Sequence, residues 1–490
     1  MRKLKFLSFL KKNGIIIFIL LLTAFLRFYQ IEEKTSFLGE QGRDLLIAKD
    51  ILSLKKLTLL GPPTSLSSNI HFGPLYHYFN ALWLGIFKLN PLGPAIGFGF
   101  LNLLACGFLY LTAKNFGFKR AGILASLLFA TSPLMIAYGQ STFNSYLLVP
   151  LTIFSLWAIS KFWQKRQRPW LFLAGFFAGV AIKANFLSYG LFFSVFFLIV
   201  LLKKNWLKKI KKIFWFIGGN LLGIMPYLIF ELRHAFFNTK GFIAWLQTAS
   251  VNEQQNFLQT LPDGFFKSFY YSLGNQNNFL TIVLLILSLS FFIFFLCQKK
   301  KDDFFYIIWL FWLVNIFLIR VYQGELLNHY LGVTYPFVFL WFGYLFNKLI
   351  SFRRGLIFFM GFVFLIVIQL GQFEFKAKTG LGMPSGWTMK TTKQSAKIIA
   401  EDTSGRFNIA NLLDGDTRAY AYRYLISLSG KEPLGVEEYP QTETLYVITR
   451  VDEKEVLSYP VWEIYSLGQL RIEKSWLVKD NIKIFKLVKK

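Results

Sequence analysis

The chain has 490 residues, of which 54% are hydrophobic and 19% aromatic, whereas only 16% are charged. Soluble globular proteins carry roughly 25% charged residues, so this composition excludes an ordinary soluble fold and indicates an integral membrane protein. The net charge of +28 would suggest nucleic-acid binding in a soluble chain. Basic residues also gather in the cytoplasmic loops of membrane proteins, so we expect no nucleic-acid partner.

The first element is an apolar run over residues 14–27, and the chain begins with the basic segment MRKLKFLSFLKKNG. No small-residue cleavage site follows Phe28, so we interpret this run as a retained signal anchor with a cytoplasmic amino terminus.

Loops rich in Lys and Arg alternate with loops that are not. The basic loops lie at 2–12, 114–120, 161–168, 203–212, 299–301 and 348–354. If all of them are cytoplasmic, an even number of membrane crossings separates each from the next. The sequence then predicts about eleven transmembrane helices, each near the roughly 20 residues that cross a bilayer. They fall at 14–29, 92–113, 120–138, 146–162, 169–183, 186–202, 213–231, 279–297, 304–320, 330–347 and 355–372.

The apolar stretch 71–89 would break this alternation if it crossed the membrane, so we predict that it lies on or dips into the outer face. The crossings at 169–202 form a tight pair, for which a re-entrant hairpin is the alternative. The outer segments are then 30–91, 138–146, 233–278, 320–329 and the tail from 373. All four histidines fall on this side, which favours an extracytoplasmic site.

From residue 373 onward the sequence pattern differs from that of the preceding apolar helices, and it predicts a second domain. Residues 407–413 and 444–450 have the pattern of strands, and residues 416–430 that of a helix with Asp416 as its cap. A strand–helix–strand unit is typical of a small α/β domain. We therefore expect a polytopic α-helical membrane domain at 1–372 and a soluble extracytoplasmic α/β domain at 373–490, in the plasma membrane.

The segment FLGEQGRDLLIAKDILS at 37–53 holds the most informative polar residues. Glu40 and Asp44 are four residues apart, so on a helix they share one face, and Arg43 is able to reach a carboxylate. The alternative is an amphipathic surface helix whose charges are only solvated.

Glu40, Arg43, the helix at 46–49 and the run His71-Phe-Gly-Pro-Leu-Tyr76 together resemble the GT-C type membrane glycosyltransferases. Within that class the pattern is similar to the protein O-mannosyltransferases and the aminoarabinose–lipid A transferases, which commonly have His-Pro-Pro-Leu-Tyr. The resemblance extends over roughly the first 350 residues and includes the large first outer loop.

The resemblance implies an inverting glycosyltransferase that moves a sugar from a polyprenyl-phosphate donor to a hydroxyl acceptor outside the cytoplasm, on a protein, lipid or glycan. Glu40 occupies the position of the family's general base, where the family usually has Asp, and Asp44 is then a helper or second carboxylate. A transporter or flippase of lipid-linked sugars and a non-catalytic membrane subunit remain alternatives.

The leaving lipid phosphate needs positive charge or hydrogen-bond donors. The candidates are basic residues on the outer side, mostly at helix ends. Interfacial anchoring explains Lys183 equally well, and it explains each of the other helix-end residues better when that residue is taken singly, so the argument is their convergence on one face. They are Arg43, Lys183, Arg233, His234, Arg320 and His329. His71, Tyr76 and Asn144 are the candidates for acceptor or sugar contacts.

The second outer loop departs from the family pattern. It has Gln140 and Asn144 where these enzymes often carry an Arg and a second acidic residue. Asn is a poorer ligand than a carboxylate for divalent cations. His71 and His77 with Glu40 leave a divalent metal open, but we assign no metal site and no cofactor.

Overall fold

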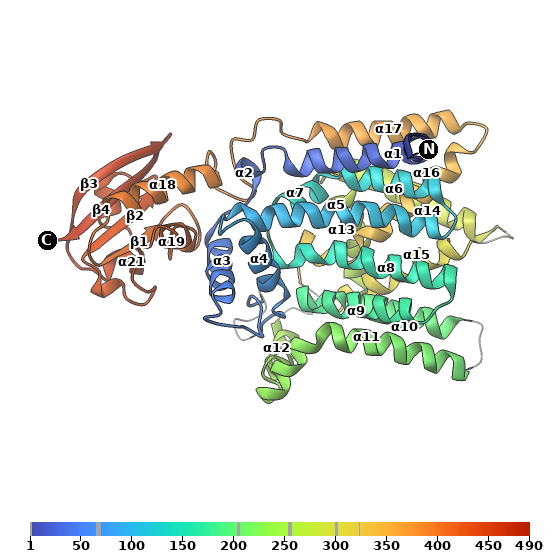
Figure 1. The fold of residues 1–490 in the computed structure, drawn as a ribbon, viewed down its shortest axis with the longest axis horizontal. Coiled ribbons are helices and arrows are strands. Elements are labelled where there is room, and N and C mark those ends of the chain that lie inside the picture. The colour runs from blue at the N-terminus through green and yellow to red at the C-terminus, as the bar shows by residue number, and fades with distance from the viewer. Residues whose placement is uncertain (1, 65–69, 203–205, 253–256, 299–301, 323) are drawn as a thin grey trace.

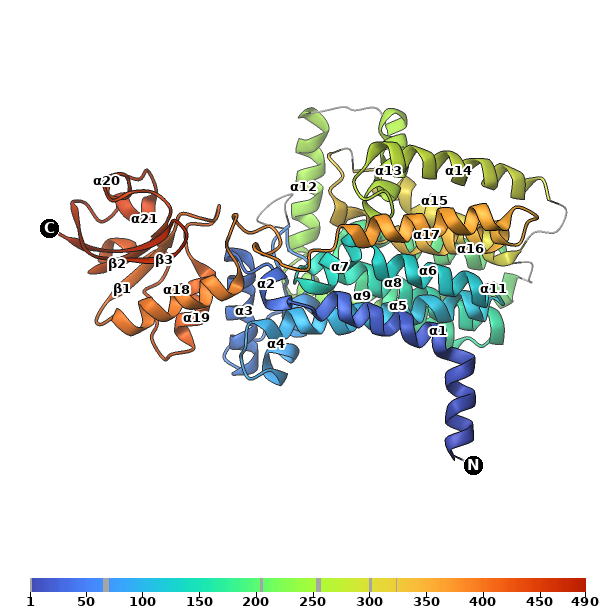
Figure 2. The same cartoon turned by 90° about the horizontal axis from the view of Figure 1, so that it is seen from above.

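A computed structural model describes residues 2–64, 70–202, 206–252, 257–298, 302–322 and 324–490. Long apolar helices run side by side in one bundle, and a small domain with a sheet stands beyond one end of it (Figures 1 and 2). The amino terminus lies at the opposite end of the bundle from that domain (Figure 1). The basic segment 299–301 and part of 203–212 lie outside the described residues.

Each predicted crossing contains an apolar helix. These helices are α1 (Arg2–Phe28), α5 (Leu92–Asn115), α6 (Lys119–Thr131), α7 (Pro133–Gln140), α8 (Leu148–Lys165), α9 (Pro169–Ala184), α10 (Tyr189–Leu201), α11 (Trp206–Arg233), α14 (Asn278–Leu296), α15 (Asp303–Ile319), α16 (Tyr335–Ile350) and α17 (Gly355–Gly371). Within the described residues, 4 helical stretches are long and apolar enough to cross a bilayer alone, or 5 if the bent α6–α7 pair counts as one. The predicted helices are therefore present, whereas the number of crossings stays a prediction.

The segments predicted to lie outside the membrane are also largely helical. They contain, wholly or in part, α2 (Ile31–Lys34), α3 (Gly39–Leu52), α4 (Leu75–Ile86), η1 (Asn144–Leu147), α12 (Phe237–Asn252), α13 (Phe257–Ser272) and η3 (Asn328–Leu331). The short helix η2 (Phe186–Ser188) lies at the start of the predicted crossing 186–202. Helices α3 and α4 lie between the bundle and the small domain (Figure 1). The sequence did not predict α13, whose Phe269 is fully buried in the core of the bundle, as is Leu273 just after the helix. Pro262 interrupts its apolar pattern.

The break between α6 and α7 has a clear cause and an unexpected partner. Pro133 begins α7 and has no N–H, so the carbonyl of Phe129 lacks its helical donor. The two helices are bent by 64°. The fully buried Arg27 of α1 donates through Nη2 to the Phe129 carbonyl at 3.0 Å and through Nη1 to the Ala130 carbonyl. Its Nε donates to Asn102 Oδ1 at 3.0 Å, so Arg27 is held between three elements.

We expect Arg27→Leu to lower the thermal unfolding midpoint of the detergent-solubilised protein. The substitution leaves two buried carbonyls without donors, each at a cost of about 1–3 kcal/mol. Arg354→Leu, at an exposed position before α17, is the matched control and should leave the midpoint unchanged. Equal midpoints for the two variants would show that Arg27 does not hold the bend.

The tail forms the predicted α/β domain. It contains α18 (Met389–Asp402), β1 (Phe407–Asn411), α19 (Tyr420–Ser427), η4 (Tyr439–Gln441), β2 (Thr444–Thr449), α20 (Glu453–Val456), α21 (Trp462–Tyr465), β3 (Leu470–Lys479) and β4 (Ile482–Lys489). The strand order is β1-β2-β4-β3, with β1 and β2 parallel and the other pairs antiparallel.

One detail of the tail prediction is wrong. The helix begins at Tyr420 rather than at residue 416, after Ala419 in a left-handed conformation, and Asp416 is not its cap. The Asp416 carboxylate instead accepts hydrogen bonds from the backbone N–H and the Nε of Arg418, at 3.2 and 2.7 Å. Local side-chain hydrogen bonds of this kind compete with helix formation.

Candidate functional site

Helix α3 carries the carboxylates that the sequence singled out. Glu40, in its first turn, is exposed, whereas Asp44, one turn later, is only 4% exposed. The helix packs between α4 on one side and the tail on the other, which buries Leu45 and Ala48 completely or nearly so. This packing therefore gives the two carboxylates different surroundings, one open to solvent and one inside.

Asp44 forms an ion pair with its neighbour Arg43. Nη2 and Nε of Arg43 both donate to Asp44 Oδ1, at 3.0 and 3.2 Å. Burial raises the pKa of Asp44 to about 7 although the Arg43 guanidinium opposes that shift. The predicted contact between Arg43 and a carboxylate is thus present, and Asp44 titrates close to neutral pH.

The start of α4 adds buried polar side chains beside this pair. His77 is 2% exposed, and burial together with the Arg43 guanidinium lowers its pKa to about 4, so it is neutral at pH 7. The pKa of His71 is also lowered, by burial and by Arg43. Burial and the nearby Asp44 raise the pKa of Tyr76. Glu40 acts electrostatically on Arg43 as well.

We call this group the polar cluster. Its members are Glu40, Arg43, Asp44, His71, Tyr76 and His77. Among the described atoms, His71 Nδ1, His77 Nδ1 and both amide atoms of the neighbouring Asn80 are buried without a hydrogen-bond partner. Buried polar groups normally have partners, so this set has unused capacity for a polar ligand or water.

Lys183, at the end of α9, lies against the segment that leads into α4. The backbone N–H of Gly73 donates to the Lys183 carbonyl at 3.0 Å. A Cβ atom at Gly73 would lie 2.6–2.8 Å from the Cβ, Cγ and Cδ atoms of Lys183, so only glycine fits here without a shift. Asn144 Nδ2 donates to the carbonyl of Ala184, the next residue, at 3.0 Å. Lys183 and Asn144 therefore lie next to each other and beside the His71 segment.

The other four phosphate candidates lie elsewhere at the helix ends. Arg233, the last residue of α11, and His234 after it are exposed, and His234 stacks on Phe230 at 4.2 Å between ring centres. His329 packs its ring edge to face against Phe143 at 5.1 Å, beside Asn144. Their contact with a donor phosphate stays a prediction.

Arg320 is the fourth of these candidates. It is 2% exposed and lies 3.8 Å from Asp263 of α13. The pairing with Asp263 gives Arg320 a structural role, and contact of Arg320 with a donor phosphate stays a prediction.

Sequence reasoning missed Glu231 near the end of α11. Its buried carboxylate accepts hydrogen bonds from the backbone N–H of Asn238 and of Thr239, at 3.1 and 3.0 Å. Asn238 Oδ1 in turn accepts from the backbone N–H of His71 at 2.8 Å. Glu231 therefore holds the chain at His71. The Asn-Thr pair at the start of α12 was the only available signal.

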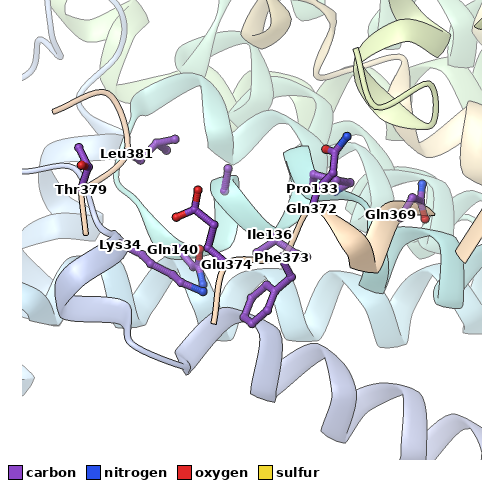
Figure 3. A pocket seen from close by; sticks show the side chains of 12 residues that line it. Lys34, Pro133, Ile136, Gln140, Gln369, Gln372, Phe373, Glu374, Thr379 and Leu381 are labelled. Carbon is purple, nitrogen blue, oxygen red and sulfur yellow. The ribbon is translucent and has the colours of Figure 1, made fainter. Parts of the chain in front are cut away.

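A cavity of about 320 Å³ lies away from the polar cluster, where α2, α7 and the carboxy-terminal end of α17 meet the linker to the tail (Figure 3). Lys34, which is 9% exposed, lines it and places its ammonium 3.6 Å from the centre of the Phe373 ring. Gln140 also lines it and donates to the Leu26 carbonyl at 2.8 Å.

In the described part of the chain, no three His, Cys, Asp or Glu side chains group closely enough to hold a metal ion.

Comparison with known proteins identifies the fold. The family model of dolichyl-phosphate-mannose-protein mannosyltransferases matches residues 71–230, from the His71 segment to the end of α11. The structure of ArnT from Cupriavidus metallidurans bound to undecaprenyl phosphate superposes with a TM-score of 0.63 at 10% identity, covering 97% of this chain and 98% of that one. The chain has the fold of the GT-C membrane glycosyltransferases. That recognition, made from the polar pattern of the first outer loop, is confirmed.

A second GT-C structure is more distant. The oligosaccharyltransferase of Archaeoglobus fulgidus, solved with Zn and sulfate, has a TM-score of 0.53 at 12% identity and covers 91% of this chain and 69% of that one. No curated protein sequence matches this chain. At these identities the structures establish the GT-C fold, and the match of the family model leaves α3 with Glu40 outside its range.

Proposed function

We propose that this GT-C protein is an inverting glycosyltransferase that moves a sugar from a polyprenyl phosphate to a hydroxyl acceptor outside the cytoplasm. The observation that carries the proposal is the polar cluster on α3 and α4, at the end of the bundle that faces the tail (Figure 1). Two comparisons support the donor class. The matching family is named for dolichyl-phosphate-mannose, and ArnT was solved with undecaprenyl phosphate bound.

In the proposed reaction the acceptor oxygen attacks the anomeric carbon of the donor as the bond from that carbon to the phosphate oxygen breaks. Glu40 takes the proton of the acceptor hydroxyl, and the lipid phosphate leaves with the electron pair of the broken bond. A single displacement of this kind inverts the anomeric configuration. Exposure of Glu40 suits a base that has to reach an external acceptor.

The leaving phosphate is stabilised by positive charge in a site that excludes water. We assign this role to Arg43 and Lys183, with Asp44 holding the Arg43 guanidinium through its ion pair. His71, Tyr76 and Asn144 line the same region and are proposed to contact the sugar or the acceptor. Arg233, His234, Arg320 and His329 are proposed to guide the donor phosphate at the outer helix ends.

The proposed orientation places the amino terminus in the cytoplasm and the tail outside the plasma membrane. It is supported by the positions of the two ends of the chain on opposite sides of the bundle (Figure 1). The basic segment 348–354 between α16 and α17 belongs to the cytoplasmic side in this arrangement.

The function is tested with the purified protein in proteoliposomes that contain a labelled polyprenyl-phosphate sugar and a membrane extract as the hydroxyl source. We expect the label to move to an acceptor, and NMR of the product to show the anomeric configuration opposite to that of the donor. Movement of the intact donor between leaflets without cleavage would identify a transporter instead. Neither cleavage nor movement would identify a non-catalytic subunit, and retained configuration would exclude single displacement.

A further inference from the structure

The first backbone N–H of α3 is capped by the tail, whereas Gln41 Oε1 of the helix itself accepts from the N–H of Leu38 at 3.0 Å. The residue before the helix is Leu38, whose side chain has no hydrogen-bond acceptor. The backbone N–H of Gly39, the first residue of α3, instead donates to Asp414 Oδ2 at 2.8 Å. A carboxylate at this end also interacts favourably with the helix dipole. Asp414 thus does for α3 what a capping residue normally does from the adjacent chain.

Close backbone packing fixes the same end of α3 against the tail. A Cβ atom at Gly42 would lie 2.2 Å from the backbone nitrogen of Ala421. A Cβ atom at Gly39 would lie 2.9 Å from Cβ of Asp416. Side chains at these two positions would push the helix and the tail apart, so the glycines allow the helix to lie directly on the start of α19.

The contact continues along the helix. Nζ of Lys49 donates to Ser427 Oγ at 3.0 Å, at the far end of α19. Between the two ends, Leu45 of α3 packs into one apolar core with Tyr422 and Ile426 of α19. Helix α3 is therefore held at its start by the loop that precedes α19, and in its middle and at its end by α19 itself.

We propose that Asp414 is a positioning residue, and that the tail acts as a clamp that sets where α3 presents Glu40. The consequence for catalysis rests on the proposed function, in which Glu40 is the general base. Glu40 directly follows the residue that Asp414 caps, so movement of that turn moves the base. Small displacements of a reacting group lower turnover strongly. The clamp itself does not depend on the identity of the reaction.

Hydrogen exchange followed by mass spectrometry on the full-length protein tests the clamp without an activity assay. We expect Asp414→Ala to raise amide exchange in a peptide spanning residues 36–46 by about ten-fold, as loss of a cap does. Asp414→Asn keeps an oxygen acceptor and should exchange close to wild type. The matched control is Asp452→Ala, which removes an exposed carboxylate bonded to Lys483 at 2.7 Å in the same domain. Equal exchange in Asp414→Ala and Asp452→Ala would overturn the clamp.

Sugar transfer by the same three variants tests the link to catalysis. We expect the kcat of Asp414→Ala to fall about ten-fold while the KM for the donor stays within about two-fold, with rescue in Asp414→Asn. Faster exchange with unchanged kcat would keep the clamp but overturn the positioning of Glu40. If the wild type transfers no sugar, the proposed function and its link to Asp414 both fail, and the exchange data still decide the clamp.

Discussion

Replacing Glu40 by glutamine should lower the kcat of sugar transfer by at least about 100-fold, because general base catalysis typically contributes 10²–10⁴-fold. Glutamine keeps the size of the side chain and its exposed position but has no basic oxygen able to take the acceptor proton. Steady-state rates with a synthetic lipid-phosphate sugar measure the effect. Glu40→Asp, which restores the residue type usual in the family, should retain more activity than Glu40→Gln.

Asp50→Asn is the matched control for this experiment. Asp50 lies on the same helix and faces Lys55 at 3.9 Å, away from the polar cluster. Its substitution should leave kcat unchanged. Full activity in Glu40→Gln together with loss in Asp44→Asn would move the general base from Glu40 to Asp44.

The second large effect concerns the ion pair inside the cluster. We expect Asp44→Asn to lower kcat about 10- to 100-fold, because an uncharged partner holds the Arg43 guanidinium less firmly against the leaving phosphate. The pKa of Asp44 is raised to about 7. The ionised form is thus gained as the pH rises through 7, and the kcat of the wild type should rise between pH 6 and 8.

The pH profile separates the role of Asp44 from a general loss of folding. In Asp44→Asn the rise centred near pH 7 should disappear, leaving a flat profile at a lower rate. The free energy of unfolding should change with pH in the opposite direction to kcat. A buried carboxyl with a raised pKa binds its proton more tightly when folded, so the free energy of unfolding of the wild type falls as the pH rises from about 4 to 7. A rate rise that persists in Asp44→Asn would assign the titration to another group.

The hydrophobic pattern was sufficient to predict the helices of the bundle. Long apolar runs leave few alternatives in a membrane, because every backbone polar group has to be satisfied within the segment. The pattern did not reveal α13, in which Pro262 and Asp263 interrupt the apolar run even though Phe269 is buried. It also placed α19 four residues too early, because Asp416 makes local hydrogen bonds with Arg418 instead of capping the helix.

The candidate site was predictable only in part. The spacing of Glu40 and Asp44 predicted one helix face, but their different exposure depends on the packing of the tail and α4 against α3. Arg27 and Asp414 had no sequence signal of their own, and the only signal for Glu231 was the Asn-Thr pair to which it is bonded. Each satisfies backbone groups of a segment far away in sequence or on another helix, and such partners are defined only by the folded structure.

Quantifying both products of one reaction, the free lipid phosphate and the glycosylated acceptor, distinguishes a glycosyltransferase from a transporter and from a non-catalytic subunit. Purified protein is given a polyprenyl-phosphate sugar, and free polyprenyl phosphate and acceptor-linked sugar are quantified by mass spectrometry over time. Equal amounts of both should form with the wild type, and neither should rise above background with Glu40→Gln. Donor that stays intact, or lipid phosphate that forms equally fast with both proteins, would contradict a glycosyltransferase whose base is Glu40.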